Sequence, residues 1–318
     1  MSIASPFHAK STALEVVSGH DLSAKTVLIT GASSGIGVET ARALLSAGAE
    51  TILAVRDTAK GDGMAQELRA STGNARAHVL ELDLGSLQSV RRAAQHFWDR
   101  WSRLDILIDN AGVMATPHDY TPDGFELQFG TNHLGHYLLT ALLLPALRAA
   151  APARVVALSS SGHRRSDVHF EDLQYRTRPY DKWDAYGQSK TANALFAVGL
   201  TQRYADEGIT ANAVHPGGIH TGLQKYIPEE EWQALGWVDA QGNINPLFKT
   251  PEQGASTSVW AAVGQELDSV GGLYLEDCQQ STPFDSAKPY TGYKPYALDP
   301  EHAERLWTVS EELVGAEK

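Results

Sequence analysis

Tyr186 and Lys190 stand four residues apart in the segment Tyr186-Gly-Gln-Ser-Lys190. In a helix, this spacing places both side chains on one face. A free tyrosine titrates at about pH 10 and is a poor acid–base at neutral pH. A neighbouring ammonium favours the phenolate and lowers that pKa, which suits a proton shuttle for a carbonyl or an alcohol. The pair therefore predicts acid–base chemistry at Tyr186.

The same pattern occurs a second time, in Tyr290-Thr-Gly-Tyr-Lys294. That copy lies among prolines and a glycine, where no helix could align the two side chains. Tyr186 instead precedes residues 191–204, whose alanine, leucine and phenylalanine content favours a helix. We therefore assign the chemistry to the first copy.

Three consecutive serines, Ser159, Ser160 and Ser161, follow an apolar run at residues 154–158. If that run is a strand of a parallel sheet, the serines lie at its carboxyl end, where ligands bind. A hydroxyl at this edge could polarise the oxygen of a substrate. Serine clusters also form plain turns, so the serines acquire this role only together with Tyr186.

A glycine-rich turn follows the first predicted strand, residues 26–30. It reads Gly31-Ala-Ser33-Ser34-Gly35-Ile36-Gly37 and leads into a predicted helix. Glycines let the backbone approach a pyrophosphate, and the helix N-terminus offers free N–H donors. The turn predicts a dinucleotide site, with a tight turn that holds no ligand as the alternative.

The second predicted strand ends in Arg56-Asp57, which bears on the choice of cofactor. A carboxylate after this strand usually holds the ribose of NAD, whereas an arginine favours the 2′-phosphate of NADP. Arg56 comes first and can pair with a phosphate. Asp57 could neutralise Arg56 or cap the next helix. NADP(H) is favoured over NAD(H).

Short apolar runs alternate with amphipathic stretches over most of the chain, a pattern typical of parallel strands connected by helices. The predicted fold is α/β, a single-domain doubly wound parallel sheet (Rossmann) of about seven strands with helices on both faces. The expected strands are residues 26–30, 51–55, 78–82, 104–108, 154–158 and 209–214, and the expected helices are residues 35–47, 58–71, 86–101, 132–150 and 185–204.

The domain organisation is predicted to be simple, because no linker divides the chain. We expect an N-terminal extension at residues 1–22 and one oxidoreductase domain at residues 23–318. Residues 216–250 have weak periodicity and suit a substrate lid, although a surface excursion is an alternative. The apolar side chains that would favour an apolar or aromatic substrate in this segment are Tyr226, Trp232, Trp237, Leu247 and Phe248.

The bulk composition limits the possible partners of the 318-residue chain. A net charge of −12 disfavours binding to nucleic acid. The single cysteine, Cys278, cannot form an intramolecular disulfide and fits a reducing compartment. No apolar run is long enough for a membrane span or a signal peptide. The expectation is a soluble, cytoplasmic protein.

Taken in order, these motifs resemble the short-chain dehydrogenase/reductase family over nearly the whole chain. The flanking segments are similar to the branch of retinol dehydrogenases, WW-domain oxidoreductases and chloroplast Tic32-like proteins. The matching motifs are Thr30-Gly31-x-x-x-Gly35-x-Gly37, Asp109-Asn110-Ala111-Gly112, Asn132, Ser159 to Ser161, Tyr186-x-x-x-Lys190, and Pro216-Gly217 with Thr221.

The resemblance implies a role for each matching residue. Tyr186 would be the general acid/base, and Lys190 would hold the nicotinamide ribose and lower the tyrosine pKa. Ser160 would bind the reacting oxygen, with Ser159 and Ser161 as close rivals, and Asn132 would support a proton relay. The implied cofactor-binding set is Gly31, Ser33, Ser34, Gly35, Ile36, Gly37, Arg56, Asp83, Leu84, Asn110, Ala111, Gly112, Tyr186, Lys190, Pro216, Gly217, Ile219 and Thr221.

One motif departs from the family pattern. The usual Asn-Asn-Ala-Gly appears as Asp109-Asn110-Ala111-Gly112. The first position mainly stabilises the sheet in the family, so the change concerns local packing more than chemistry. Pairs of histidines, His133 with His136 and His215 with His220, have no carboxylate to complete a ligand set, so no metal is predicted.

The predicted function is transfer of a hydride between NADP(H) and a small-molecule carbonyl/alcohol substrate. A non-catalytic NADP-binding scaffold or redox sensor is an alternative, because a fold does not determine function. A sugar-nucleotide epimerase or dehydratase fits less well, since those relatives usually space the first glycines as Gly-x-x-Gly-x-x-Gly. The helices at residues 132–150 and 185–204 are the family's usual pairing surfaces, so a homodimer or homotetramer is possible.

Overall fold

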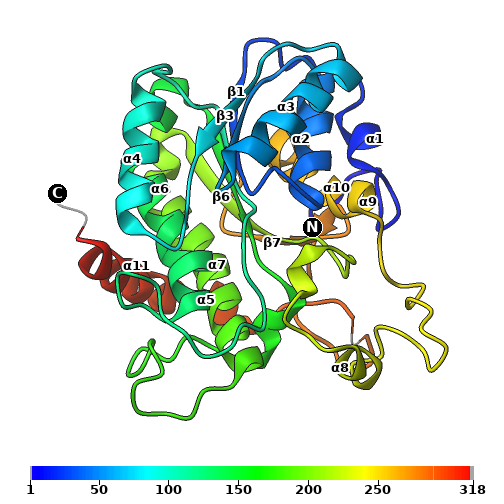
Figure 1. Ribbon diagram of the computed structural model, residues 1–318. Helices are drawn as coiled ribbons and strands as arrows, with labels where there is room; N and C mark the ends of the chain where they lie inside the picture. Colours follow the sequence, from blue (N-terminus) through cyan, green and yellow to red (C-terminus); the bar gives the residue numbers. More distant parts are fainter. Residues whose placement is uncertain (1, 289, 316–318) are drawn as a thin grey trace.

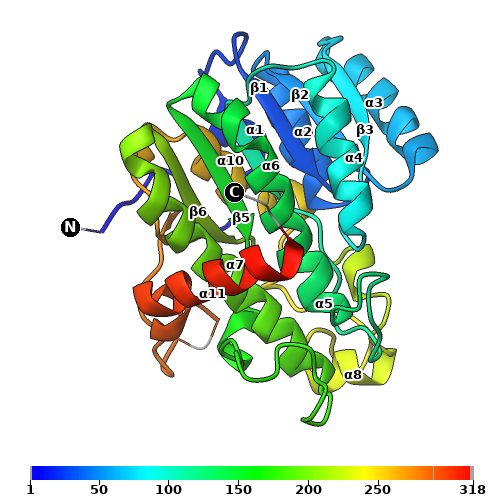
Figure 2. The same cartoon turned by 90° about the vertical axis from the view of Figure 1, so that its left-hand side faces the viewer.

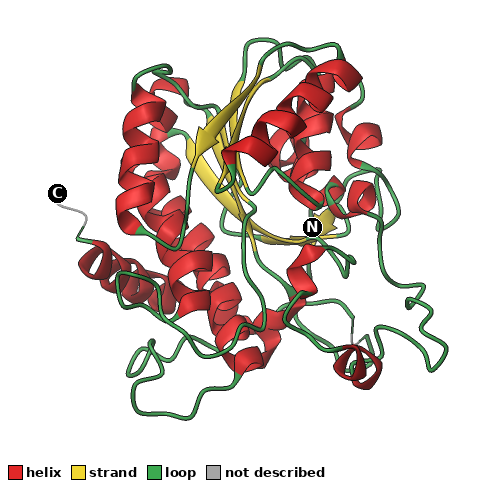
Figure 3. Cartoon of the chain, in the orientation of Figure 1, coloured by secondary structure: helices red, strands yellow, loops and turns green. Residues whose placement is uncertain are grey.

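In the computed structural model, which describes residues 2–288 and 290–315, one sheet runs through the molecule and helices cover both of its faces (Figures 1 and 3). Met1, Pro289 and residues 316–318 lie outside the described residues. Met1 belongs to the predicted N-terminal extension, and the others belong to the predicted oxidoreductase domain. The sheet order is β3-β2-β1-β4-β5-β6-β7-β8. The strands of the described residues are β1 (Thr26–Thr30), β2 (Glu50–Val55), β3 (Ala77–Glu81), β4 (Ile106–Asp109), β5 (Ala153–Leu158), β6 (Ile209–His215), β7 (Tyr274–Glu276) and β8 (Gln279–Gln280).

Each central strand is buried on both faces, because its alternate side chains enter two separate cores. Leu28 of β1 packs with the helices on one face, and its neighbours Val27 and Ile29 pack on the other. The first face carries α4 (Leu87–Trp98), α6 (Gly135–Ala150), α7 (Lys182–Tyr204) and α11 (Pro300–Val314), and the second carries α1 (Ala13–Val17), α2 (Ile36–Ser46), α3 (Thr58–Thr72) and α10 (Ser256–Val263). Three short helices, α5 (Leu127–Phe129), α8 (Glu229–Ala234) and α9 (Pro251–Gly254), lie in connections.

The predicted doubly wound sheet is confirmed, and all six predicted strands form in parallel pairs. Two further strands complete the sheet. β7 continues the parallel pairing beside β6, whereas β8 is antiparallel and lies at the edge. β7 has three residues and β8 has two, both polar glutamines, so neither makes the apolar run by which a strand is recognised.

The predicted N-terminal extension packs on the domain. Thr12 and Glu15 form a reciprocal capping box at the start of α1. Ala13, Val16 and Val17 are buried in the same core as α2 and α10. Within the part of the chain that the structure describes, no helix combines the length and the apolar character that crossing a bilayer requires.

The C-terminal helix α11 lies across α7 (Figure 2). It covers part of the helix at residues 185–204, which the sequence analysis considers as a contact between subunits. Trp307 stacks on Phe196 of α7 at a centroid distance of 6.0 Å. A Cβ atom on Gly199 would lie 3.3 Å from the carbonyl oxygen of Ala303, so the glycine permits close approach of the two helices. A second copy could not use this part of α7 while α11 occupies it.

Candidate active site

The glycine-rich turn connects β1 to α2 at the carboxyl edge of the sheet. Gly31 and Gly35 have φ angles of +70° and +60°, which favour glycine. A Cβ on Gly37 would lie 2.6 Å from both Asn110 Nδ2 and Gly31 O. Since Gly35 provides no side-chain cap, the N–H groups at the start of α2 are available to a ligand. Bare backbone and free donors fit a pyrophosphate.

Asn110 and Ala111 are held against this turn by Thr30, the first residue of the glycine motif, to which sequence analysis gave no separate role. The Thr30 Oγ1 atom accepts hydrogen bonds from the backbone N–H groups of Asn110 and Ala111, both at 2.9 Å. Asn110 Nδ2 in turn donates to Thr30 O at 2.7 Å. Gly112 lies close to Lys190, since a Cβ on Gly112 would be 3.5 Å from Lys190 Nζ.

The other predicted cofactor residues follow β2 and β3 along the same edge. Asp57 caps α3 by accepting from the backbone N–H of Lys60 at 3.0 Å, which was one of its two predicted roles. Arg56 is exposed, and no ion pair in the described ranges involves it. Asp83 accepts from the backbone N–H of Gly85 at 3.0 Å, and Leu84 beside it is buried.

Pro216, Gly217, Ile219 and Thr221 lie on the loop after β6 and come near the same turn. A Cβ on Gly35 would lie 3.3 Å from Thr221 Cγ2. Gly217 adopts a φ of +103°, which explains a glycine at that position. The structure therefore brings the glycine turn and the Pro-Gly loop together. Ser33 is half-buried on the turn, and Ser34 is exposed.

Tyr186 lies in the first half of α7, with 4% of its surface exposed. Its ring is packed against Gly162, where a Cβ would come within 2.7 Å of Tyr186 Cε1. Burial raises the pKa of the Tyr186 phenol to about 12, and a side-chain hydrogen bond with Ser160 opposes that rise. The phenol is therefore protonated at neutral pH.

The three serines after β5 face in different directions. Ser159 is buried, and its hydroxyl donates to the backbone carbonyl of Lys190 at 2.8 Å. The Ser160 Oγ atom accepts from the Gly162 N–H at 3.0 Å, which leaves its own proton for the Tyr186 side. Ser161 contributes its backbone N–H to His215 Nδ1 at 3.2 Å. Ser160 is the hydroxyl of the three that contacts the tyrosine.

Lys190 points back toward the sheet. Its Nζ atom donates to Leu158 O at 3.0 Å and lies 5.8 Å from the centroid of the Tyr186 ring. Burial lowers the pKa of Lys190 to about 8. Burial disfavours the charged form of both side chains, the Tyr186 phenolate and the Lys190 ammonium.

Asn132 lies in a π-helical turn, Gly130–Leu134, that leads into α6. Such bulges are frequent at functional sites. Asn132 Oδ1 accepts from the Val113 N–H at 2.8 Å, and Nδ2 donates to Ser189 Oγ at 2.9 Å. Ser189 donates to the carbonyl oxygen of Tyr186 at 2.8 Å. These hydrogen bonds link Asn132 to the backbone of α7 at Tyr186, and Ser189 is a member that sequence reasoning missed.

Asp109, the departure from the family motif, ends β4. Its Oδ2 atom accepts from Thr140 Oγ1 at 3.4 Å. Its Oδ1 atom is buried and has no hydrogen-bond partner among the described residues. Burial raises the pKa of this carboxyl well above its usual range.

The histidines considered as metal ligands make hydrogen bonds within the protein. His133 Nε2 lies 2.8 Å from Ser310 Oγ, and His136 Nε2 lies 2.8 Å from Thr30 Oγ1. Burial lowers the pKa of His133 to about 3 and that of His136 to about 4, so both rings are neutral. Over residues 2–288 and 290–315, no three His, Cys, Asp or Glu side chains group as a metal site would require.

The second tyrosine–lysine pair lies away from any regular helix. Tyr290 is 66% exposed. Lys294 precedes the short turn Pro295–Leu298 and lies over the ring of Phe284 at 4.6 Å. The structure therefore does not align these two side chains as it does Tyr186 and Lys190.

An apolar wall surrounds Tyr186. Met114, Ala115 and Ile227 are buried with it, and the side chains packed around this group are Trp183, Leu223, Trp232 and Trp237. Trp232 and Trp237 were predicted from the sequence, whereas Tyr226 and Leu247 are largely exposed and lie outside this group. Met114, Ala115 and Trp183 were missed, because nothing in their local pattern distinguishes them from core residues.

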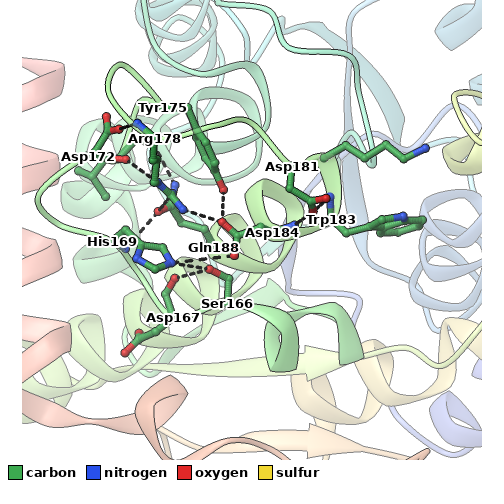
Figure 4. A network of polar contacts seen from close by, with 12 residues as sticks. Ser166, Asp167, His169, Asp172, Tyr175, Arg178, Asp181, Trp183, Asp184 and Gln188 are labelled. Atoms are coloured by element: carbon green, nitrogen blue, oxygen red, sulfur yellow. Dashed lines mark hydrogen bonds and ion pairs between the residues drawn. The ribbon is translucent and has the colours of Figure 1, made fainter.

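A polar network fixes the connection between β5 and α7 (Figure 4). Asp184, in the first turn of α7, accepts from Tyr175 Oη and from Arg178 NH1, both at 2.6 Å. Arg178 NH2 also donates to Gln188 Oε1 at 2.9 Å. Asp181 caps α7 through the N–H groups of Trp183 and Asp184. These contacts set the start of the helix that carries Tyr186 and Lys190.

Comparisons with known proteins find similarity to oxidoreductases over most of the chain. A family model described as short chain dehydrogenase matches residues 25–232. A Streptomyces lividans protein named "Probable oxidoreductase" is 45% identical over 93% of this chain and 99% of its own length. Human retinol dehydrogenase 13 is 42% identical over 92% of this chain and 85% of its own length. Among solved structures, an uncharacterized protein from Mycobacterium paratuberculosis superposes with a TM-score of 0.72 at 36% identity, covering 96% of this chain and 98% of the other.

Proposed function

The chain belongs to the short-chain dehydrogenase/reductase family of oxidoreductases, and we propose that it moves a hydride between NADP(H) and a carbonyl/alcohol pair. Tyr186 is the proposed general acid/base. The observation that carries the proposal is the buried phenol of Tyr186, which contacts Ser160 and lies beside an apolar wall at the carboxyl edge of the sheet. Tyr186, Ser160, Lys190 and Asn132 are the proposed catalytic set.

The residues around the glycine turn fit a dinucleotide. A side chain at Gly37 would fill the space against Asn110, and the uncapped start of α2 offers N–H donors for a pyrophosphate. The exposed Arg56 is available for a 2′-phosphate, since the carboxylate of Asp57 is used as a helix cap. This arrangement supports NADP(H) over NAD(H).

The proposed reaction reduces a carbonyl to an alcohol, or runs in reverse. The nicotinamide, when bound, supplies a hydride to the carbonyl carbon. The Tyr186 phenol gives its proton to the carbonyl oxygen, and the Ser160 hydroxyl donates a hydrogen bond to the same atom. The Lys190 ammonium stabilises the phenolate that remains, and it is charged at neutral pH because its pKa is about 8. In the reverse direction, Tyr186 takes the proton of the alcohol.

The apolar wall supports an apolar or aromatic substrate. Trp183, Trp232 and Trp237 are large, rigid side chains that exclude water from the space beside Tyr186. On this proposal, residues 216–250 act as the substrate lid, since they contribute Leu223, Ile227, Trp232 and Trp237 to the wall.

Replacing Tyr186 with phenylalanine tests the proposal. The Tyr186→Phe variant should lose about 10²–10⁴-fold in kcat with an aromatic aldehyde and NADPH, because the proton donor is removed while the ring remains. Its affinity for NADPH, measured by calorimetry, should be unchanged. The matched control is Tyr290→Phe, which removes the exposed hydroxyl of the second pair and should keep full activity. Full activity in Tyr186→Phe would exclude the mechanism.

A further inference from the structure

Glu231 makes contacts that its neighbours on α8 do not. Its Oε2 atom accepts from Lys182 Nζ at 2.5 Å, and its Oε1 atom accepts from Trp183 Nε1 at 2.6 Å. Glu229 and Glu230 are exposed at the start of the same helix and form no ion pair within the described part of the chain. One carboxylate thus connects the 216–250 segment to two adjacent side chains on the first turn of α7.

The indole that Glu231 holds is part of the wall beside the catalytic tyrosine. Trp183 meets the ring of Tyr186 edge-to-face at a centroid distance of 6.5 Å. It meets Trp237 in the same manner at 5.9 Å. The Arg165 guanidinium lies over the Trp183 ring at 5.2 Å. Because the indole N–H of Trp183 donates to the Glu231 carboxylate, this hydrogen bond restricts the orientation of the Trp183 ring beside Tyr186 and Trp237.

Apart from the apolar packing in the wall, the other polar contacts of the 216–250 segment with the rest of the described chain are at its base. Ile219 and Lys249 pair as a parallel bridge, and Lys249 Nζ donates to Asp277 Oδ1 at 2.6 Å. Lys10 Nζ donates to Phe248 O at 3.1 Å, close to the same end. Glu231 lies in the middle of the segment, where α8 projects away from the body of the molecule (Figure 1).

The two hydrogen bonds of Glu231 should hold α8 strongly to the start of α7. Both are hydrogen bonds to a charged acceptor, which are shorter and stronger than bonds between neutral groups. The Glu231 and Lys182 side chains are only 24% and 30% exposed, so solvent screens their attraction less than that of a surface pair. The partner side is rigid, because Asp181 caps α7 and Arg178 and Tyr175 hold Asp184 one residue beyond Trp183 (Figure 4).

We propose that Glu231 is a positioning residue for the substrate site: its carboxylate fastens α8 to the first turn of α7 and holds Trp183 and Trp237 as the wall against which the substrate lies beside Tyr186. The inference rests on the proposed function. It makes substrate affinity, and not the proton-transfer step, depend on one attachment between Glu231 and Lys182.

Steady-state kinetics on four single variants and one double variant test this role. Glu231→Gln and Lys182→Met each remove the ion pair, and Glu231→Ala removes both contacts. Each should raise KM for an aromatic aldehyde about three- to tenfold while kcat stays within about twofold and the affinity for NADPH is unchanged. Glu230→Gln, one residue away and exposed, is the control and should match the wild type. Combining Glu231→Gln with Lys182→Met should add little, because both remove the same pair.

Hydrogen exchange measures the attachment without turnover. Backbone amides of residues 225–240 should exchange faster in Glu231→Gln and Lys182→Met than in the wild type or Glu230→Gln. Unchanged exchange, or faster exchange with an unchanged KM, would overturn the role of Glu231. A wild-type protein that reduces no carbonyl would instead overturn the proposed function, and the exchange result would still decide whether Glu231 fastens α8.

Discussion

Gly162 is the residue on which the placement of the Tyr186 ring most directly depends. A methyl group at this position would lie 2.7 Å from Cε1 and 2.8 Å from Cδ1 of the ring. The tyrosine cannot move away freely, because it is buried within the apolar wall. Either the ring or the turn that carries Ser160 must therefore shift.

Gly162→Ala should lower kcat by about 10–100-fold, since a displacement of about 1 Å at a reacting group can cost that much. The affinity for NADPH should change little. Gly63→Ala, on α3, adds the same methyl group where no atom lies within 4 Å, and should leave the rate unchanged. Equal rates in the two variants would show that the ring does not need this contact.

The sequence identified single residues where their chemistry is uncommon. A tyrosine and a lysine at helical spacing, serines after a strand and glycines before a helix are recognisable from residue type alone. Thr30, Ser189 and Trp183 are not, because their roles come from tertiary contacts: Thr30 holds Asn110 of the next strand, and Ser189 meets Asn132 from another helix. The raised pKa of Asp109 likewise depends on burial that a motif does not reveal.

On the proposed function, the turn between β2 and α3 is the element on which the choice of cofactor should depend. Arg56 and Asp57 are adjacent, yet the structure gives them different tasks, since Asp57 caps α3 and Arg56 extends into solvent. Arg56→Ala should raise KM for NADPH about tenfold and leave KM for NADH nearly unchanged, because only NADPH carries the 2′-phosphate.

Asp57→Ala is the matched comparison for the same turn. It should lower the free energy of unfolding by about 1 kcal/mol through loss of the cap, with little effect on the ratio of the two KM values. Kinetics with both cofactors and urea unfolding of both variants would separate the roles. A ratio altered by Asp57→Ala alone would assign the cofactor choice to the carboxylate.

Elements with a clear strand or helix pattern in the sequence were predicted closely. The predicted strand at residues 26–30 coincides with β1, and the helix predicted at residues 58–71 is α3, one residue longer. The short strands β7 and β8 and the π-turn before α6 were not predicted. β7 is specified by its pairing with β6, and the π-turn by the contacts of Asn132 with Val113 and Ser189, so neither leaves a local pattern.

The stability of the whole molecule should depend on the proton held by Asp109. Burial raises the pKa of this carboxyl in the folded state, so folding must retain a proton that the unfolded chain releases above about pH 4. The contribution is favourable below the unfolded pKa and is lost as pH rises toward the folded pKa. Wild-type stability should therefore fall with rising pH relative to a variant that lacks the acid.

Asp109→Asn provides that variant. It should be more stable than the wild type by about 1–2 kcal/mol at pH 8, and the difference should shrink toward pH 5. Thermal and urea unfolding at several pH values would measure it. Parallel pH profiles for the two proteins would mean that Asp109 is ionised in the folded state.

At the scale of the whole molecule, α11 explains why the sequence could not predict whether α6 and α7 contact a second subunit. The apolar faces of α6 and α7 suit either a second subunit or an internal helix, and both alternatives have the same pattern. The structure fills part of this surface with Trp307 and its neighbours. The hydroxyl of Ser310 also reaches His133, which precedes α6 in the π-turn of Asn132. The C-terminal helix therefore supports the turn that carries a proposed catalytic residue.

Three of the seven tryptophans of the chain, Trp183, Trp232 and Trp237, lie in the wall beside Tyr186. An indole emits light at wavelengths that a reduced nicotinamide absorbs. A reduced cofactor bound at this edge of the sheet would thus accept excitation energy from these rings, and an apolar ligand between them would change their emission. On the proposed function, the side chains that would enclose the substrate would also report ligand binding by their fluorescence, with no label and no turnover.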